Sequence, residues 1–171
     1  MKENPLVLTF DIGTQSARAM LVDRYGAVLC KAQKTFEKAY YSPEPDWAEQ
    51  DPDMYWNSIC EMSRRLKAEN EAFWPDIIAV TCTCIRATTI CLDQQGRPLR
   101  SAIVWLDKRV AENLPPLPIS TRFALKMVGI TQAVETIRSH MACNWIIQNQ
   151  PDIWAKTDKF VLLSAYLNLR F

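Results

Sequence analysis

The stretch FDIGTQSARAMLVD, from Phe10 to Asp23, decides how the chain begins to fold. A hydrophobic run over residues 6–10 stops at Asp-Ile-Gly-Thr-Gln-Ser and resumes at once over residues 17–22. Such residues favour turns, because glycine tolerates unusual backbone angles and short polar side chains bond to nearby amides. A second turn at residues 23–26 leads to another apolar run. The pattern predicts an antiparallel meander with strands over residues 5–10, 17–23 and 27–36.

The rest of the chain alternates between loop, helix and strand patterns. Residues 38–53 are rich in proline, aromatic and acidic residues and predict a surface loop. Asp51 then suits an N-cap and Pro52 the first position of a helix, whose buried stripe would hold Tyr55, Ile59, Met62 and Leu66.

Further strands are predicted over residues 77–82, 88–93 and 101–105. The first of these has little polarity, so we expect it to be buried on both faces. The remainder looks helical, with residues 160–163 open between strand and helix. The order β-β-β-α-β predicts one α/β domain over residues 1–171, with a mixed sheet and flanking helices.

Composition excludes several function classes. Twenty basic and nineteen acidic side chains give a net charge of +1, so no overall field attracts nucleic acid or a membrane surface. The apolar run before Asp11 is too short for a signal-peptide core, and we expect a cytoplasmic protein with reduced cysteines. With one histidine in the chain, Cys82 and Cys84 are interpreted as small fillers on one face of a strand rather than zinc ligands.

The turn from Asp11 to Ser16 has two interpretations. It lacks the GxxxxGK[ST] pattern of a P-loop and leads to a strand instead of a helix. Gly13 would let a ligand approach the backbone, while Thr14, Gln15 and Ser16 offer donors that suit phosphate oxygens. Asp11 would hold a hydrated Mg²⁺, which prefers one or two carboxylates and several waters. Composition alone favours a plain hairpin turn.

Four motifs in order resemble the FGGY carbohydrate kinases, the family of glycerol kinase, xylulokinase and ribulokinase. DIGTQSARA at residues 11–19 is similar to D-x-G-T-x-S-x-R-A, and DWAEQDP at residues 46–52, followed by Trp56, to G-W-x-E-x-D-P-x-x-W. Residues 79–89 resemble a strand and sugar-contacting turn, and AIVWLDKR at residues 102–109 resembles A-I-x-W-x-D-x-R. Segments between residues 144 and 167 resemble the helical end of the family's first domain. The resemblance implies the ribonuclease-H-like core that actin and the sugar kinases share.

The resemblance also implies an activity, the transfer of the γ-phosphoryl group of ATP to a sugar or polyol hydroxyl with Mg²⁺. The residues that it places at the nucleotide phosphates are Asp11, Gly13, Thr14, Gln15, Ser16 and Arg18, with Asp11 at the metal. Those that it places at the sugar are Arg86, Trp105, Asp107 and Arg109. Without the family resemblance, we would interpret Trp105 as a core aromatic residue, Asp107 as a helix N-cap and Arg109 as a solvated charge.

Two departures from the family pattern matter. Ala87 stands where several members have a polar or acidic sugar ligand and others have glycine, so a substrate hydroxyl would lack a partner there and specificity for glycerol is not expected. The family's catalytic aspartate and its adenine-binding C-terminal domain lie beyond Phe171, which implies a truncated or split chain without appreciable turnover of its own.

The expected partners are a sugar or polyol, together with either the missing C-terminal lobe or a second copy of the chain. Self-association would use an exposed apolar patch. The candidates for this patch are Trp154, Phe160, Leu163, Tyr166 and Phe171. A non-catalytic sugar-binding or partner-binding remnant is the alternative function, and an actin-like assembly protein is the least favoured.

Overall fold

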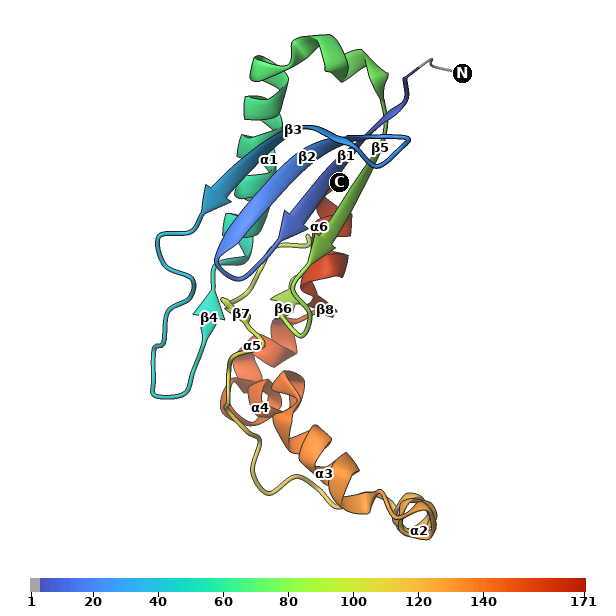
Figure 1. Cartoon of the computed structure of the whole chain (residues 1–171). Coiled ribbons are helices and arrows are strands. Elements are labelled where there is room, and N and C mark those ends of the chain that lie inside the picture. The colour runs from blue at the N-terminus through green and yellow to red at the C-terminus, as the bar shows by residue number, and fades with distance from the viewer. Residues whose placement is uncertain (1–3) are drawn as a thin grey trace.

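The computed structural model describes residues 4–171, which form an elongated body from which two helices project as an arm (Figure 1). The upper sheet has the strand order β3-β2-β1-β5. Its strands are β1 (Leu6–Ile12), β2 (Ser16–Asp23), β3 (Val28–Thr35) and β5 (Ile77–Cys84). β1, β2 and β3 pair antiparallel, which confirms the predicted meander, and β5 joins β1 in parallel.

The helix α1 (Pro52–Glu69) makes the crossover between β3 and β5 and covers one face of the upper sheet (Figure 1). It begins as predicted, because the Asp51 side chain accepts a hydrogen bond from the Asp53 amide at 3.0 Å and Pro52 needs no amide partner. Its buried residues include the predicted stripe of Tyr55, Ile59, Met62 and Leu66. They pack on alternate residues of β1 and β2 in the main core.

A second, smaller sheet lies below the first and has the order β4-β7-β6-β8, all antiparallel. Its strands are β4 (Glu49–Gln50), β6 (Thr89–Leu92), β7 (Ala102–Ile103) and β8 (Lys159–Leu162). β4 lies inside the segment predicted as loop, and β7 is shorter than expected. Residues 160–163, which the sequence left undecided between strand and helix, are mainly strand, since α6 (Leu163–Arg170) begins where β8 ends.

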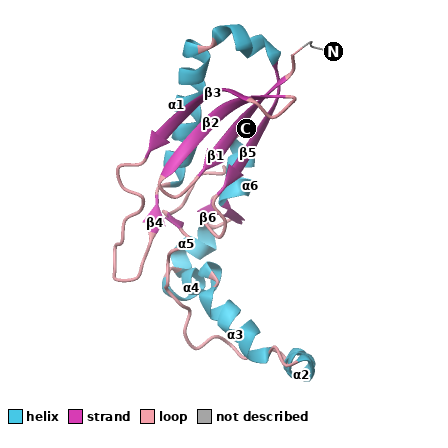
Figure 2. Cartoon of the chain, viewed as in Figure 1, coloured by secondary structure: helices cyan, strands magenta, loops and turns pink. Residues whose placement is uncertain are grey.

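The remaining elements are helical, as Figure 2 shows. They are η1 (Glu71–Asp76), α2 (Ile119–Val128), α3 (Thr131–His140), α4 (Ala142–Asn149) and α5 (Pro151–Lys156). α2 and α3 form the arm and bury no residue, whereas α4 buries Trp145 and Ile146. None of the helices in residues 4–171 is both long and apolar enough to span a membrane. The mixed upper sheet with its flanking helices agrees with the predicted fold class.

Two predictions about burial were wrong. β5 is not covered on both faces but lies at the edge of the upper sheet, where Ile78 is 61% exposed and Val80 50%. An apolar run indicates a strand but not which strands pair with it. Leu163 and Tyr166 of the expected self-association patch are fully buried, because α6 packs into the core with α1. Only Phe171 of that patch is a largely exposed apolar residue.

The two cysteines of β5 follow the prediction. Cys82 and Cys84 lie on one face of the strand and pack, half-buried, against the main core. Burial raises the pKa of the Cys82 thiol to about 11 and also raises the pKa of Cys84. Both thiols are therefore protonated fillers at neutral pH.

Candidate functional site

The bend between β1 and β2 is held by its carbonyl groups. The carbonyl of Ile12 accepts a hydrogen bond from the Ile85 amide, and the carbonyl of Ser16 accepts one from the Gly13 amide, each at 2.9 Å. The carbonyl of Gln15 accepts from the Phe36 amide at 2.9 Å, and the carbonyl of Thr14 from the Gln50 side chain at the same distance.

The bend's amides are used differently. Those of Thr14 and Gln15 are not among the donors of these bonds. A Cβ at Gly13 would lie 3.2 Å from the Ser16 oxygen, so only glycine fits the tight bend without a shift. Gln15 is exposed, and Thr14 borders a cavity. Among residues 4–171 these two amides have no acceptor, and a turn with two such amides at an open surface is suited to an anion.

Asp11 and Arg18 face each other across the hairpin. They are register partners in β1 and β2, and Arg18 Nη1 donates to Asp11 Oδ2 at 2.8 Å. Both side chains are more than a third exposed, so water screens the pair and it contributes little to stability. Within residues 4–171 no group of three or more acidic, histidine or cysteine side chains could enclose a metal. A hydrated Mg²⁺ needs only one or two carboxylates from a protein, so Asp11 is the residue of the bend that could hold one.

Trp105 connects the bend to the segment after β7. Its indole Nε1 donates to Thr14 Oγ1 at 3.0 Å, across 91 positions of the sequence, while the residue as a whole stays 56% exposed. One cavity of about 380 Å³ lies between Trp105, Thr14, Arg86 and their neighbours. A second cavity of about 440 Å³ also has Trp105 in its wall and extends towards Asp107 and the helices α3 and α4. Trp105 and Ala87 line both cavities, so the indole lies where they meet.

Arg86 is exposed within the bend between β5 and β6. Ala87 next to it has a left-handed backbone (φ 56°), which is unusual for a residue with a side chain. The turn directs the chain into β6 and places Arg86 at the smaller cavity, opposite Thr14. Sequence reasoning expected Arg86 and Trp105 in one site, and they do line one cavity.

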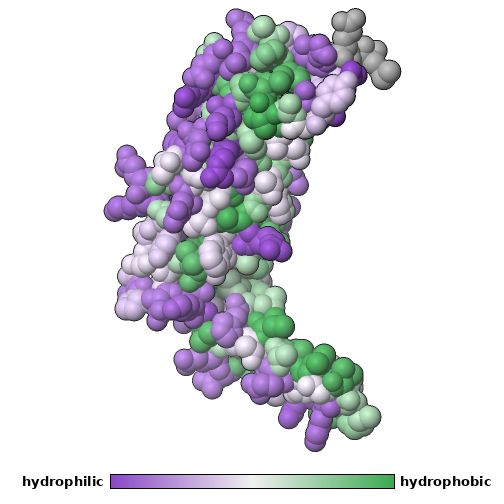
Figure 3. Space-filling view, viewed as in Figure 1, coloured by the Kyte–Doolittle hydropathy of each residue, from purple (hydrophilic) through white to green (hydrophobic). Residues whose placement is uncertain are grey.

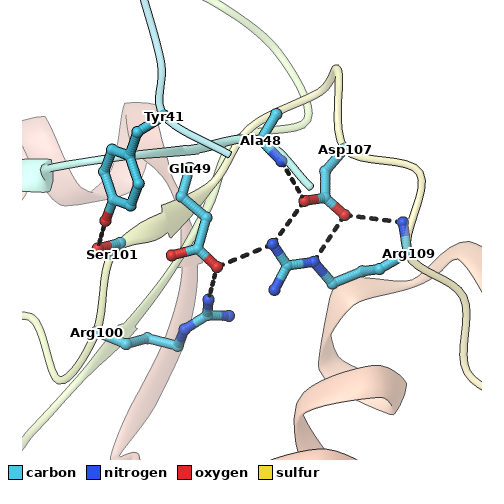
Figure 4. A network of polar contacts seen from close by, with 7 residues as sticks. All are labelled: Tyr41, Ala48, Glu49, Arg100, Ser101, Asp107 and Arg109. Atoms are coloured by element: carbon cyan, nitrogen blue, oxygen red, sulfur yellow. Dashed lines mark hydrogen bonds and ion pairs between the residues drawn. The ribbon is translucent and has the colours of Figure 1, made fainter. Parts of the chain in front are cut away.

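Asp107 and Arg109 form the centre of a buried ionic network (Figure 4). Arg109 donates from Nε to Asp107 Oδ1 at 2.8 Å and from Nη2 to Asp107 Oδ2 at 2.6 Å. The same Nη2 donates to Glu49 at 2.8 Å, and Glu49 also pairs with Arg100. The Asp107 and Arg109 side chains are only 3% and 2% exposed. Both residues border the larger cavity, but their charges are paired with each other.

Two tryptophans enclose the guanidinium of Arg109. Its Cζ lies 3.9 Å from the ring centre of Trp47 and 4.6 Å from that of Trp145, distances typical of cation–π contact. The Ala48 amide donates to Asp107 Oδ2 at 2.7 Å, which fixes the carboxylate from the β4 side. The network therefore ties β4, the segment after β7 and α4 together beside the larger cavity.

Several residues of this site were missed by sequence reasoning. Gln50 holds the Thr14 carbonyl, and the Tyr55 hydroxyl donates to the Gln50 side chain from the core of α1. Glu49 and Trp47 hold Arg109. Three of these four residues lie in the DWAEQDP motif, which was noticed for its resemblance only. The motif therefore marked these residues, but their roles in holding Thr14 and Arg109 depend on contacts that only the structure shows.

Comparison with known proteins gives a family for this fold and site. A family model described as "FGGY family of carbohydrate kinases, N-terminal domain" matches residues 6–171. A glycerol kinase of Rhodospirillum centenum is 39% identical over 118 residues, which cover 68% of this chain and 23% of the relative. A glycerol kinase of Janthinobacterium sp. is 30% identical over 154 residues, which cover 90% of this chain and 30% of the relative.

Solved structures agree on the fold. A gluconate kinase from Lactobacillus acidophilus aligns with a TM-score of 0.75 at 18% identity, over 98% of this chain and 33% of that one. A xylulose kinase from Rhodospirillum rubrum aligns with a TM-score of 0.72 at 22% identity, over 96% of this chain and 33% of that one. The chain therefore spans about a quarter to a third of the length of the proteins that it matches.

Proposed function

Since the chain belongs to the FGGY family of carbohydrate kinases and matches its N-terminal domain, we propose that it forms the sugar-binding and first phosphate-binding lobe of an ATP-dependent kinase. The reaction would move the γ-phosphoryl group of ATP to a hydroxyl of a sugar or polyol. Glycerol kinases among the relatives, together with xylulose and gluconate kinases among the proteins of the same fold, support a polyhydroxylated small molecule as the substrate class.

One observation carries this proposal: the bond between Trp105 and Thr14. The indole that borders the larger cavity is held by the hydroxyl of the bend whose amides suit an anion. A sugar beside Trp105 and a phosphate at Thr14 would therefore be neighbours. Phosphoryl transfer depends mainly on such positioning and on charge stabilisation, and much less on covalent chemistry by the protein.

Each residue of the site has a role in this proposal. The amides of Thr14 and Gln15 would bind phosphate oxygens, and Gly13 leaves room for their approach. Bound ATP and Mg²⁺ would supply the transferred group and neutralise its charge, with Asp11 and Ser16 at the metal and phosphates.

The sugar side is made by different residues. Trp105 would form an apolar wall for the carbon chain of the substrate, and Arg86 would donate to its hydroxyls. Arg18 would exchange its bond with Asp11 for one with phosphate. Its pair with Asp11 is exposed and therefore weak enough to be replaced.

Asp107 and Arg109 contribute differently from Arg86. Their charged atoms are committed to each other and to Glu49, so we expect them mainly to hold the segment that carries Trp105. A direct contact between this pair and a sugar stays a prediction. A ligand hydroxyl that reached Asp107 would have to compete with three bonds from Arg109, two from its side chain and one from its amide, and with one from the Ala48 amide.

We expect the 171-residue polypeptide alone to bind ligand without catalysing transfer. A general base needs a free carboxylate near the sugar hydroxyl, and Asp107, which lines the larger cavity, is paired with Arg109. Incubation with Mg²⁺-ATP and glycerol, xylulose or gluconate should release no ADP above background. Robust turnover would contradict this expectation.

Calorimetry tests the lobe itself. The polypeptide should bind one of these three substrates, and Trp105→Ala should weaken that binding by about tenfold or more, because the apolar wall is lost. Tyr25→Ala, which removes an aromatic ring that is 79% exposed and outside both cavities, is the matched control and should have no effect. Equal effects of the two variants would refute the proposed site. Sugar binding without any affinity for Mg²⁺-ATP would instead favour a non-catalytic sugar-binding protein.

A further inference from the structure

The larger cavity beside Trp105 has a mostly apolar wall with few polar side chains. Residues of β7, α4 and β8 make much of this wall, and its polar side chains include Thr89, Asp107, Arg109 and His140. Asp107 and Arg109 were already expected at the sugar and are bonded to each other. A polyol needs partners for its hydroxyl groups in such a cavity, so we examined what Thr89 and His140 could supply.

The arm brings a histidine to the wall of the larger cavity. α3 runs back from the tip of the arm to α4 (Figure 1), and its last residue is His140, the one histidine of the chain. The hydrophobic residues of the arm gather at its tip (Figure 3), where Ile119 and Phe123 of α2 are more than 60% exposed. The opposite end of α3 ends in polar side chains, and its His140 lines the cavity.

His140 has one ring nitrogen that is used within the helix and one that is not. Its Nδ1 lies 2.8 Å from the carbonyl oxygen of Thr136, one turn earlier in α3. A carbonyl oxygen can only accept, so Nδ1 carries the proton of this bond and Nε2 of the neutral ring is an acceptor. The hydrogen bonds of this ring within residues 4–171 all involve Nδ1. Nε2 can therefore accept from a ligand hydroxyl.

Thr89 carries a hydroxyl that the rest of the lobe does not use. It is the first residue of β6 and lines the larger cavity, and its Oγ1 is buried without a hydrogen-bond partner in the described part of the chain. Nearly all buried polar groups in folded proteins have a partner, because an unmade hydrogen bond costs free energy. Rotation about χ1, the one rotatable bond between the backbone and the hydroxyl, sets whether Oγ1 faces a ligand.

We propose that Thr89 and His140 determine which substrates the lobe accepts, by binding substrate hydroxyl groups in the larger cavity. His140 Nε2 accepts a hydrogen bond from a substrate hydroxyl, and the Thr89 hydroxyl donates to a substrate oxygen. The carbon chain of the substrate lies along Trp105 and the apolar wall. The inference rests on the proposed sugar site at Trp105, and it adds the side chains that select among hydroxylated substrates. A substrate without hydroxyls at this end of the site leaves Thr89 unpaired and binds more weakly.

Thr89→Val tests the inference, and Thr88→Val is its control. Calorimetry with glycerol, xylulose and gluconate should show about five- to tenfold weaker binding of the accepted substrate to Thr89→Val, the usual effect of one lost hydrogen bond. The Oγ1 of Thr88 is also buried without a partner in residues 4–171, but Thr88 lines neither cavity. Thr88→Val should therefore leave binding unchanged. Thr89→Ser keeps the hydroxyl and should retain the binding.

His140→Leu tests the second side chain. It removes the acceptor and should also weaken binding by about five- to tenfold. Gln132→Leu is the matched control, because Gln132 is an exposed polar residue of the same helix that lines neither cavity. It should not change the binding.

Urea unfolding separates a role in binding from a role in the fold. Thr89→Val should not lower the unfolding midpoint, because it removes a buried hydroxyl that has no partner among residues 4–171. A variant that lost stability together with binding would show that the hydroxyl supports the fold, and this result would overturn the inference.

Failure of this inference and failure of the proposed function give different results. If Trp105→Ala weakens sugar binding while Thr89→Val and His140→Leu do not, the site at Trp105 stands and the inference is wrong. If the polypeptide binds none of the three substrates, both are wrong. Equal effects of the Thr89 and Thr88 variants on binding would also overturn the inference, because only Thr89 lines the cavity.

Discussion

Replacing Arg109 with methionine should destabilise the protein strongly, because it removes a buried cation and leaves its carboxylate partners in place. Three side-chain hydrogen bonds are lost, two to Asp107 and one to Glu49. The contacts with the two tryptophans are replaced by those of a neutral side chain. Breaking a buried ion pair in this way typically costs about 3–5 kcal/mol.

The remaining contacts place the expected loss in the lower part of that range. Asp107 keeps the amide donors of Ala48 and residue 109, and Glu49 keeps Arg100. We therefore expect a loss of about 3 kcal/mol, against a total of about 5–15 kcal/mol for a typical domain. With a urea m-value of about 1–3 kcal/mol/M, the unfolding midpoint should fall by about 1–3 M.

Urea unfolding followed by circular dichroism measures this loss. Lys108→Met is the matched control, because it removes a neighbouring cation whose pair with Asp46 is long (3.4 Å) and exposed. It should cost less than about 1 kcal/mol. Adding Asp107→Asn to Arg109→Met should recover at least about 1 kcal/mol, since the orphaned charge is removed.

The reasoning would be refuted if Arg109→Met and Lys108→Met had equal effects on stability. A variant that kept its stability and lost sugar binding would show that Arg109 contacts the ligand instead of holding the site together. If the double variant regained stability but not sugar binding, the Asp107–Arg109 pair would have two roles: it would hold the site together and also contact the ligand.

Three further predictions concern the bend between β1 and β2, the turn at Gly26, and the buried thiol of Cys82 and hydroxyl of Tyr166. Tyr55→Phe should lower the free energy of unfolding in urea by about 1–2 kcal/mol, because the Gln50 side chain loses a buried hydrogen-bond donor. The variant should also bind phosphate more weakly, since Gln50 holds the Thr14 carbonyl. Unchanged phosphate binding would show that Gln50 holds the bend without the Tyr55 hydroxyl. Gly26→Ala should lower the free energy of unfolding by about 1–2 kcal/mol, since a φ of 85° is strained for any residue with a side chain. An unchanged free energy of unfolding would contradict this account. Burial raises the pKa of Cys82 to about 11 and that of Tyr166 to about 12, so the folded state keeps both groups neutral. Their contribution to stability is complete below their unfolded pKa values of about 8.5 and 10, and it should fall as the pH rises through the folded values. A urea midpoint that stayed constant over this alkaline range would contradict the burial of both groups.

Local chemistry made much of the fold predictable. The meander from β1 to β3 follows from turn residues that lie between apolar runs, and each strand pairs with its neighbour in the sequence. The start of α1 follows from Asp51 and Pro52, which act within one turn of the helix. In both cases the interacting groups are close in the sequence. The bend around Gly13 was predicted as a phosphate site through the family resemblance, because composition alone favoured a plain hairpin turn.

The rest depended on partners that are distant along the chain. Asp107 and Arg109 were expected at a sugar through the family resemblance, and otherwise as a helix N-cap and a solvated charge. The structure shows both side chains buried, with Arg109 between Trp47 and Trp145 and bonded to Glu49. No periodicity in residues 102–109 could indicate this, because the partners lie about 40 to 60 positions away.

The amino-acid sequence by itself determined the strands of the upper sheet, the start of the first helix and the residue types of the bend between β1 and β2. Only the tertiary structure decided that Trp105 meets Thr14 and that β5 ends a sheet. Secondary structure follows from backbone preferences and the spacing of apolar residues over a few positions. Burial and ion pairing depend on which distant segments pack together, and that packing is a property of the whole chain.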